Sequence, residues 1–256
     1  MRLETKKMVF MAIISLISTV LVLSCSKDSD EEETSKTVKQ LVGKWVVDAP
    51  ASFKTIEFTE TGIYIIVGQT ANEIVVGTFS VDGKRITLAN YAEIEGVSVS
   101  GNAATFKIAL DVAPQEFVEY KAVKAASPIT DTERSRLVSA STWKVISVEY
   151  VLEDYNGDGI VNNEDYDAEG FADIQEQATG SSVLFTKAGT YLILFPIGSE
   201  QLYQLGSWKW KDANEEVISY TQTPDDDAEW RNGSIYTLSE SELIYRQAAF
   251  LFYLKH

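Results

Sequence analysis

The feature that most constrains the fold of this chain is an internal repeat. The pattern Phe-Thr-x-x-Gly-x-Tyr occurs at residues 58–64 and again, with identical spacing, at residues 185–191. After each motif comes a glycine followed by Thr or Ser and an aromatic residue, at Gly77 in the first copy and Gly206 in the second. Because the two elements recur at similar spacing, with 15 residues from Gly62 to Gly77 and 17 from Gly189 to Gly206, the 256-residue chain is predicted to hold two domains of the same fold.

Each copy reads as a series of short β-strands in hairpin order. In the first copy, residues 79–81 lead through the turn Asp82-Gly83 into residues 85–88. Apolar residues alternate along such runs, and the Asp-Gly turn is typical of a β-hairpin. Later strands are predicted at residues 104–110, 117–123, 183–186, 191–195, 203–210, 216–220, 234–238, 242–246 and 250–254. Roughly eight strands per copy favour an up-and-down antiparallel barrel, which closes its own edges.

The opening of the first copy resembles that of a known family. Gly43-Lys44-Trp45 follows a short helical turn predicted at residues 38–41, and it resembles the Gly-x-Trp that opens lipocalins. With the repeated motifs and the leader described below, the chain is similar to the lipocalin-like lipoproteins of Bacteroidota over nearly all of its mature length. The resemblance implies an all-β fold of two tandem antiparallel lipocalin-like barrels, at residues 38–125 and 126–256.

One tryptophan in each copy is expected to lie in the core. In a small barrel the interior is filled by side chains, and we expect Trp45 and Trp143 to close one end of each barrel. The second copy departs from the family pattern, because Ser141 and Thr142 stand where a glycine would precede its tryptophan. A brief helical pattern at residues 131–139 lies between the copies.

The N-terminal segment has the pattern of a targeting sequence. Basic residues precede an apolar run at residues 8–23, which is shorter than the roughly 20 residues that span a bilayer. The run leads into Val-Leu-Ser-Cys, which resembles the lipobox of bacterial lipoproteins and ends at the only cysteine, Cys25. A retained anchor helix is the alternative. The resemblance implies a signal peptide at residues 1–24 and attachment to the membrane through a lipid on Cys25.

The segment after the cysteine is polar and acidic. Residues 25–37 have the composition of a flexible tether. They also resemble the charged stretch that directs lipoproteins of Bacteroidota to the outer face of the outer membrane. The resemblance therefore implies an outer-membrane lipoprotein exposed at the cell surface.

Composition argues against nucleic acid as a partner and against most catalytic classes. A net charge of −16 without clustered Lys or Arg opposes binding to a phosphate backbone. The only histidine is His256, so a Ser–His or Cys–His pair lacks a base and a His/Cys zinc site lacks ligands. A pair of carboxylates stays open in principle, but no spacing selects one. We therefore expect a protein that is not an enzyme.

The second copy carries an insertion that contains the sequence DYNGDGIVNNED. From tryptophan to the repeated Phe-Thr motif, the first copy has 13 residues and the second 42. The extra residues lie near 153–178, and long inserts on a barrel usually sit at its rim and carry function. A helix is predicted after the loop, around residues 164–177. A second acidic run, Asp225-Asp226-Asp227, lacks alternating spacing and is interpreted as a solvated loop.

The inserted sequence has the spacing of a calcium loop. Calcium needs six to eight converging oxygens, and Gly159 permits the sharp turn that brings them together. The pattern resembles the dockerin version of the EF-hand loop, with aspartate instead of glutamate at the last position. A plain acidic turn is the alternative, and magnesium suits an all-protein loop less well. The expected cofactor is one structural Ca²⁺, and the expected ligands are Asp154, Asn156, Asp158, Ile160 through its carbonyl, Asn162 and Asp165.

Aromatic residues are concentrated in the second copy. Trp208 and Trp210 are two apart on one predicted strand, so they face the same side. They fill the core or, with Tyr191, Trp230 and Tyr245, they line a cavity or form a platform for a sugar ring. Three functions follow as hypotheses: binding of a small apolar or amphipathic ligand in one barrel, glycan binding as an accessory to an outer-membrane uptake system, or a structural interaction module with filled barrels.

Overall fold

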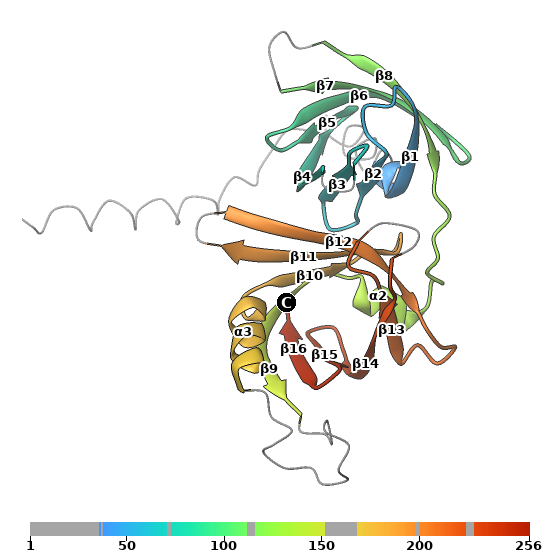
Figure 1. The fold of residues 1–256 in the computed structure, drawn as a ribbon. Coiled ribbons are helices and arrows are strands. Elements are labelled where there is room, and N and C mark those ends of the chain that lie inside the picture. The colour runs from blue at the N-terminus through green and yellow to red at the C-terminus, as the bar shows by residue number, and fades with distance from the viewer. Residues whose placement is uncertain are drawn as a thin grey trace, which may run out of the picture.

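The computed structural model describes residue 36 and residues 38–70, 73–111, 116–151, 168–197, 200–223 and 228–256. Within these ranges the chain forms two closed antiparallel barrels of eight strands each, in tandem along the sequence (Figure 1). The predicted all-β fold of two barrels is confirmed, and it fits a lipocalin-like fold. Among the helices of the described ranges, none is long and apolar enough to cross a bilayer.

The first barrel is an up-and-down ring. Each strand pairs with the next, and β1 also pairs with β8, which closes the ring. A helical turn at residues 38–41 precedes it, as predicted. Its strands are β1 (Gly43–Ala49), β2 (Thr55–Phe58), β3 (Ile63–Val67), β4 (Ile74–Asp82), β5 (Arg85–Leu88), β6 (Ala92–Ser100), β7 (Ala103–Leu110) and β8 (Val118–Lys124).

The second barrel repeats this order and adds two helices. The short helix α2 (Glu133–Val138) forms within the predicted segment, and the Thr132 hydroxyl caps it by accepting from the Ser135 N–H at 3.0 Å. The helix α3 (Ala168–Ala178) lies between the first two strands, near its predicted position. The strands are β9 (Thr142–Tyr150), β10 (Ser182–Phe185), β11 (Thr190–Ile197), β12 (Glu200–Trp210), β13 (Val217–Tyr220), β14 (Arg231–Leu238), β15 (Glu242–Gln247) and β16 (Phe250–Lys255).

The repeated motif forms the same turn in both barrels. Gly62 and Gly189 have positive φ angles of 79° and 82°, a backbone conformation that glycine adopts without steric cost. The carbonyl of each glycine accepts a 2.8 Å hydrogen bond from the next strand, from the N–H of Phe79 in one barrel and of Trp208 in the other. The motif is thus a structural signature, since it sets the corner from β2 to β4 and from β10 to β12.

One end of each barrel is closed by its first tryptophan. Trp45 and Trp143 are completely buried, which confirms that both are core residues. The indole N–H of Trp45 donates to the Leu41 carbonyl at 2.7 Å, and that of Trp143 donates to the Val138 carbonyl at 2.8 Å. In both copies the first strand is therefore joined to the helical segment that precedes it.

A third hydrophobic cluster lies between the barrels, and we call it the seam. Ile65 and Val67 of β3 meet Leu184, Leu192 and Leu205 of β10, β11 and β12, and each of the five is at most 6 % exposed. Residues next to them along the strands point into their own barrel, so the seam residues point outward and are covered by the other barrel. Figure 1 shows β10–β12 beneath β2–β4.

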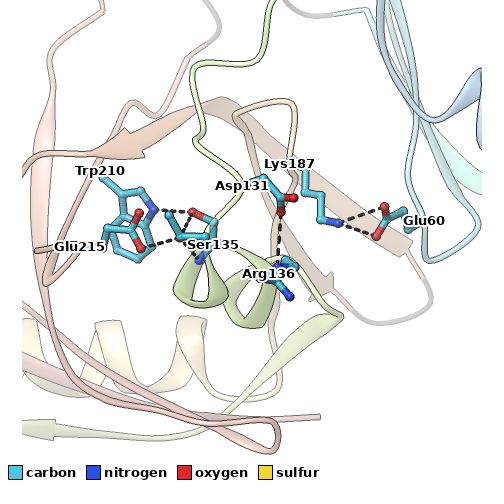
Figure 2. A network of polar contacts seen from close by, with 8 residues as sticks. Glu60, Asp131, Ser135, Arg136, Lys187, Trp210 and Glu215 are labelled. Carbon is cyan, nitrogen blue, oxygen red and sulfur yellow. Dashed lines mark hydrogen bonds and ion pairs between the residues drawn. The ribbon is translucent and has the colours of Figure 1, made fainter. Parts of the chain in front are cut away.

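Polar contacts accompany the seam. Glu57 of β2 is buried, and its carboxylate accepts a 2.5 Å hydrogen bond from the Thr190 hydroxyl. Burial raises the pKa of the Glu57 carboxyl above its ordinary value, while hydrogen bonds from Thr186 and Thr190 act in the opposite direction. At the edge of the seam, Lys187 Nζ lies 2.9 Å from the Glu60 carboxylate (Figure 2).

Candidate functional site: a cavity in the second barrel

The second barrel is hollow at one end. A cavity of about 440 Å³ lies inside it, and every one of its eight strands contributes to the wall. A binding site for a small molecule typically measures 300–1,000 Å³. The lining residues are Val145, Ile174, Gln177, Ala178, Ser181, Val183, Tyr191, Ile193, Phe195, Gln204, Tyr220, Gln222, Arg231, Tyr245, Gln247, Ala248, Phe250 and Phe252.

The helix α3 packs across this end of the barrel, whereas α2 lies at the other side of the barrel (Figure 1). Ile174 and Ala178 of α3 line the cavity. The ring of Phe171 contacts those of Tyr150 on β9 and Phe250 on β16, with centroid distances of 5.9 Å and 6.3 Å. The helix that follows the insertion therefore forms part of the cavity wall.

Three tyrosines turn their phenol groups into this region. The hydroxyls of Tyr191 and Tyr245 are hydrogen-bonded to each other. Tyr220 is 3 % exposed, and its hydroxyl has no hydrogen-bond partner among the described residues. Burial raises the pKa of all three phenols, so each stays protonated at neutral pH. The Tyr220 hydroxyl is thus a buried donor, in the wall of a cavity, for which the described residues supply no acceptor.

A positively charged side chain, that of Arg231, lies beside this hydroxyl on the neighbouring strand. Arg231 is the cross-strand neighbour of Tyr220, so both side chains lie on the inner face of the sheet. Its positive charge acts on the Tyr220 pKa in the direction opposite to burial. No acidic residue is among those described as lining the cavity, although the chain as a whole carries a net charge of −16. The cavity therefore offers hydrogen-bond donors and positive charge at one place.

The first barrel has apolar residues at the equivalent positions. The cross-strand register Phe79–Leu88 on β4 and β5 corresponds to Trp208–Tyr220 on β12 and β13, so Tyr220 stands where the first barrel has Leu88. By the same register, Arg231 stands where the first barrel has Ala92. The polar pair is thus specific to the second barrel.

Two glutamines of the cavity also stand where the first barrel has apolar residues. Gln204 pairs with Ile193 as Val75 pairs with Ile66, so Gln204 replaces a valine. Gln247 stands two residues after Tyr245, at the position that Ile108 occupies in the first barrel. The second barrel has therefore exchanged apolar interior residues for polar ones, which costs stability unless a partner satisfies them.

The two barrels differ in the connection between their first two strands, and this difference accounts for part of the cavity volume. Counting from the shared Phe-Thr motif, Phe53 of the first barrel corresponds to Gly180 of the second. Phe53 is 4 % exposed and stacks on Tyr120, with ring centroids 4.9 Å apart. Tyr120 corresponds to Phe252, which lines the cavity. Where the first barrel places an aromatic ring, the second has a glycine with open space around its Cα.

The structure divides the five predicted ligand-binding residues into three groups. Tyr191 and Tyr245 line the cavity. Trp208 is completely buried in the core, where its indole donates to the Thr186 carbonyl at 2.8 Å. Trp210 faces the same side, as predicted, and donates to the Ser135 hydroxyl at 2.8 Å (Figure 2). These two tryptophans close the end of the barrel beside α2 and do not line the described cavity.

Trp230 lies apart from the others. It is 41 % exposed, and Lys209 Nζ lies 4.1 Å from the centre of its ring. The five predicted residues therefore do not form one platform. Tyr220 and Arg231 are not among the predicted residues, although the inward alternation from Ile218 to Tyr220 along β13 points to the first of them.

The remaining predicted site residues lie outside the described residues. They are Cys25 and the six calcium-loop positions Asp154, Asn156, Asp158, Ile160, Asn162 and Asp165. Within the described ranges, no group of three or more His, Cys, Asp or Glu side chains could hold a metal ion.

Comparisons with known proteins give similarities to solved structures and no family. No family model matches the chain. No curated protein matches it either. A solved structure from Nostoc punctiforme, a protein of unknown function of the DUF3598 family, aligns with 87 % of this chain and 98 % of its own. Its sequence is 8 % identical and the TM-score is 0.23.

Proposed function

We propose that this protein binds a small amphipathic molecule reversibly in the cavity of its second barrel. The observation that carries the proposal is the Tyr220 hydroxyl, a buried donor that lies in the wall of a 440 Å³ cavity and has no partner in the part of the chain that the structure describes. A buried polar group without a partner costs about 1–3 kcal/mol. A ligand that supplies an acceptor removes that cost, and the proposed role is binding rather than catalysis.

The cavity wall has an apolar part and a polar part, so it favours a ligand with an apolar body and a polar end. Aromatic and aliphatic side chains such as Ile193, Phe250 and Phe252 favour an apolar body, because burying it removes apolar surface from water. Tyr220 and Arg231 favour an acceptor at one end, either a carboxylate or a neutral oxygen. At about 30 Å³ for each water, the cavity has room for about fifteen water molecules, which is enough for a compact ligand.

Binding is tested with 1-anilinonaphthalene-8-sulfonate, whose fluorescence rises when it leaves water. We expect saturable binding of one molecule per chain, and displacement by lauric acid. Ile193→Trp fills the cavity and should abolish the signal. Tyr220→Phe removes one hydroxyl and should weaken binding of lauric acid about tenfold, the value of one hydrogen bond.

Matched controls separate the cavity from the outer surface. Ile146→Trp places the same side chain at an exposed position of β9, and Tyr236→Phe removes a hydroxyl from a residue that is 61 % exposed. Both variants should bind like the wild type. An unchanged signal in Ile193→Trp, or no binding of either probe to the wild type, contradicts the proposal.

We also propose a structural calcium ion in the insertion of the second domain, on the sequence pattern alone. After treatment with a chelator, calorimetric titration should show one Ca²⁺ per chain, and calcium should raise the temperature of unfolding because it binds the folded state. Asp154→Ala should abolish this binding. Asp225→Ala, in an acidic run without loop spacing, is the control and should keep it. No heat of binding at millimolar calcium refutes the site.

Attachment to the outer membrane through Cys25 completes the proposal. In a Bacteroidota host the wild type should partition into the detergent phase of Triton X-114, and protease added to intact cells should degrade it. Cys25→Ala should partition into the aqueous phase, whereas Ser26→Ala should behave like the wild type. Membrane attachment that survives Cys25→Ala favours a retained helix, because the apolar run would then be the anchor.

A further inference from the structure

The seam between the barrels is built from the same positions of both copies. The repeated motif makes Tyr64 equivalent to Tyr191, so Ile65 corresponds to Leu192 and Val67 to Leu194. All four of these apolar residues belong to the seam or pack against it. The cross-strand partners Gly77 and Gly206 extend the equivalence to the next strand, where Val76 corresponds to Leu205. Each barrel therefore contributes the outer face of its second, third and fourth strands.

A contact between two equivalent surfaces has two-fold character. In a symmetric dimer each contact across the interface occurs twice. If position i of one copy touches position j of the other, then position j of the first copy touches position i of the second. Residues on the axis meet their own counterparts. Glu60 and Lys187 occupy the same place in the Phe-Thr-x-x-Gly-x-Tyr motif, and they face each other with 2.9 Å between Oε2 and Nζ (Figure 2).

The second pair of contacts is reciprocal. Glu57 accepts from Thr190, and the residues equivalent to these two are Leu184 and Ile63. Leu184 belongs to the seam cluster, and Ile63 packs against it. This pair of equivalent positions therefore occurs twice in the seam. It is hydrogen-bonded as Glu57 and Thr190, and it is apolar as Leu184 and Ile63.

We infer that the seam is a two-fold docking surface by which the first barrel recognises the second, and that Glu57 and the Glu60–Lys187 pair restrict this recognition to unlike barrels. Two first barrels would set Glu60 against Glu60 and would bury Glu57 against Ile63, which offers no donor. Two second barrels would set Lys187 against Lys187. Only the unlike pair gives both the opposite charges and the hydroxyl for the buried carboxylate.

The test cuts the chain and asks whether the halves stay together. A protease recognition sequence is inserted between Ala125 and Ala126, in the exposed connection that follows β8. After cleavage of the folded protein at about 10 μM, the two halves should co-elute as one species in size-exclusion chromatography. Separation of the wild-type halves under these conditions overturns the inference.

Substitutions in the seam locate the recognition. Leu192→Glu places a charge in the centre of the seam without entering either barrel core, and it should weaken association of the halves about a hundredfold or more. Ile146→Glu, on an exposed part of β9, is the matched control and should leave the halves together. Near-ultraviolet circular dichroism of each variant before cleavage reports whether both barrels are folded. Halves that co-elute equally well in folded Leu192→Glu contradict the inference.

A charge exchange tests partner choice without disturbing the apolar contacts. Glu60→Lys alone and Lys187→Glu alone should each weaken association of the halves about threefold to tenfold, since both side chains are partly exposed. The double variant Glu60→Lys with Lys187→Glu restores opposite charges and should recover the wild-type affinity. If the double variant is as weak as the two single losses combined, the pair does not select the partner.

Discussion

Replacing Trp143 by alanine is expected to destabilise the second barrel by about 3–5 kcal/mol, the usual cost of deleting a large buried aromatic side chain. The ring is completely buried, and its N–H donates to the Val138 carbonyl of α2. The substitution leaves a cavity at the closed end and a carbonyl without its donor. Because a domain is stable by only about 5–15 kcal/mol, this loss is a large part of the total. Urea unfolding followed by circular dichroism measures it.

Three further variants help to interpret that result. Trp143→Phe keeps most of the ring and loses the donor, so it should cost about 1–3 kcal/mol. Trp230→Phe changes a tryptophan that is 41 % exposed and should cost less than about 0.5 kcal/mol. The equivalent substitution Trp45→Ala should destabilise the first barrel by the same amount as Trp143→Ala destabilises the second. A cost below about 1 kcal/mol for Trp143→Ala would show that the indole does not hold the closed end.

Gly206→Ala is expected to be the most disruptive addition of a single methyl group, at about 3 kcal/mol or more. The new Cβ would overlap the backbone carbonyl of Thr221, which cannot turn away as a side chain can. This carbonyl belongs to a residue whose N–H donates to the Ser207 carbonyl and whose hydroxyl accepts from the Ser207 N–H, so the end of β13 is fixed against β12. Thermal unfolding of the purified variant measures the loss.

The equivalent glycine provides the comparison. At Gly77 the new Cβ would meet the ring of Tyr64 instead of backbone, about 2.7 Å away. The ring can shift if its hydroxyl gives up the hydrogen bond to the Ala89 carbonyl. Gly77→Ala should therefore cost about 1–3 kcal/mol, less than Gly206→Ala. Ser80→Ala, at an exposed position of β4, should be close to neutral. The reverse order of the two glycine variants would contradict the assigned contacts.

The sequence predicts the barrels well because the determinants of the strands are local. Alternation of apolar residues, Asp-Gly turns and the repeated glycine motif are each set by a few neighbouring residues, and the strands form where these signals place them. Trp45 and Trp143 could be assigned to the core because a large aromatic residue on the first strand of a small barrel has few other places to go.

The cavity could not be predicted in the same way, because it depends on differences between the copies in three dimensions. A glycine at position 180 means little until Phe53 is seen to occupy the equivalent place in the first barrel. Trp208 and Trp210 were correctly placed on one face. That face is the closed end of the barrel, which a spacing of two residues does not reveal.

The seam can be recognised in the sequence, but not from the alternation of apolar and polar residues along the strands. The strand β3 reads IYIIV and β11 contains YLILF, with apolar residues at successive positions. A continuous apolar run indicates a strand covered on both faces. One face of β3 lies in the barrel interior and the other in the seam, so the lack of alternation marks the contact between domains.

The position of α3 determines how fast any occupant of the cavity could exchange with solvent. The wall is a ring of hydrogen-bonded strands, and the far end is filled by Trp143 and Trp208, so the described part of the barrel leaves the end beside α3 as the way in. The helix is held there by ring contacts of Phe171 and by a long hydrogen bond from Gln175 to the Val148 carbonyl. Residence time would then depend on how readily α3 separates from β9, and affinity on the residues beneath it.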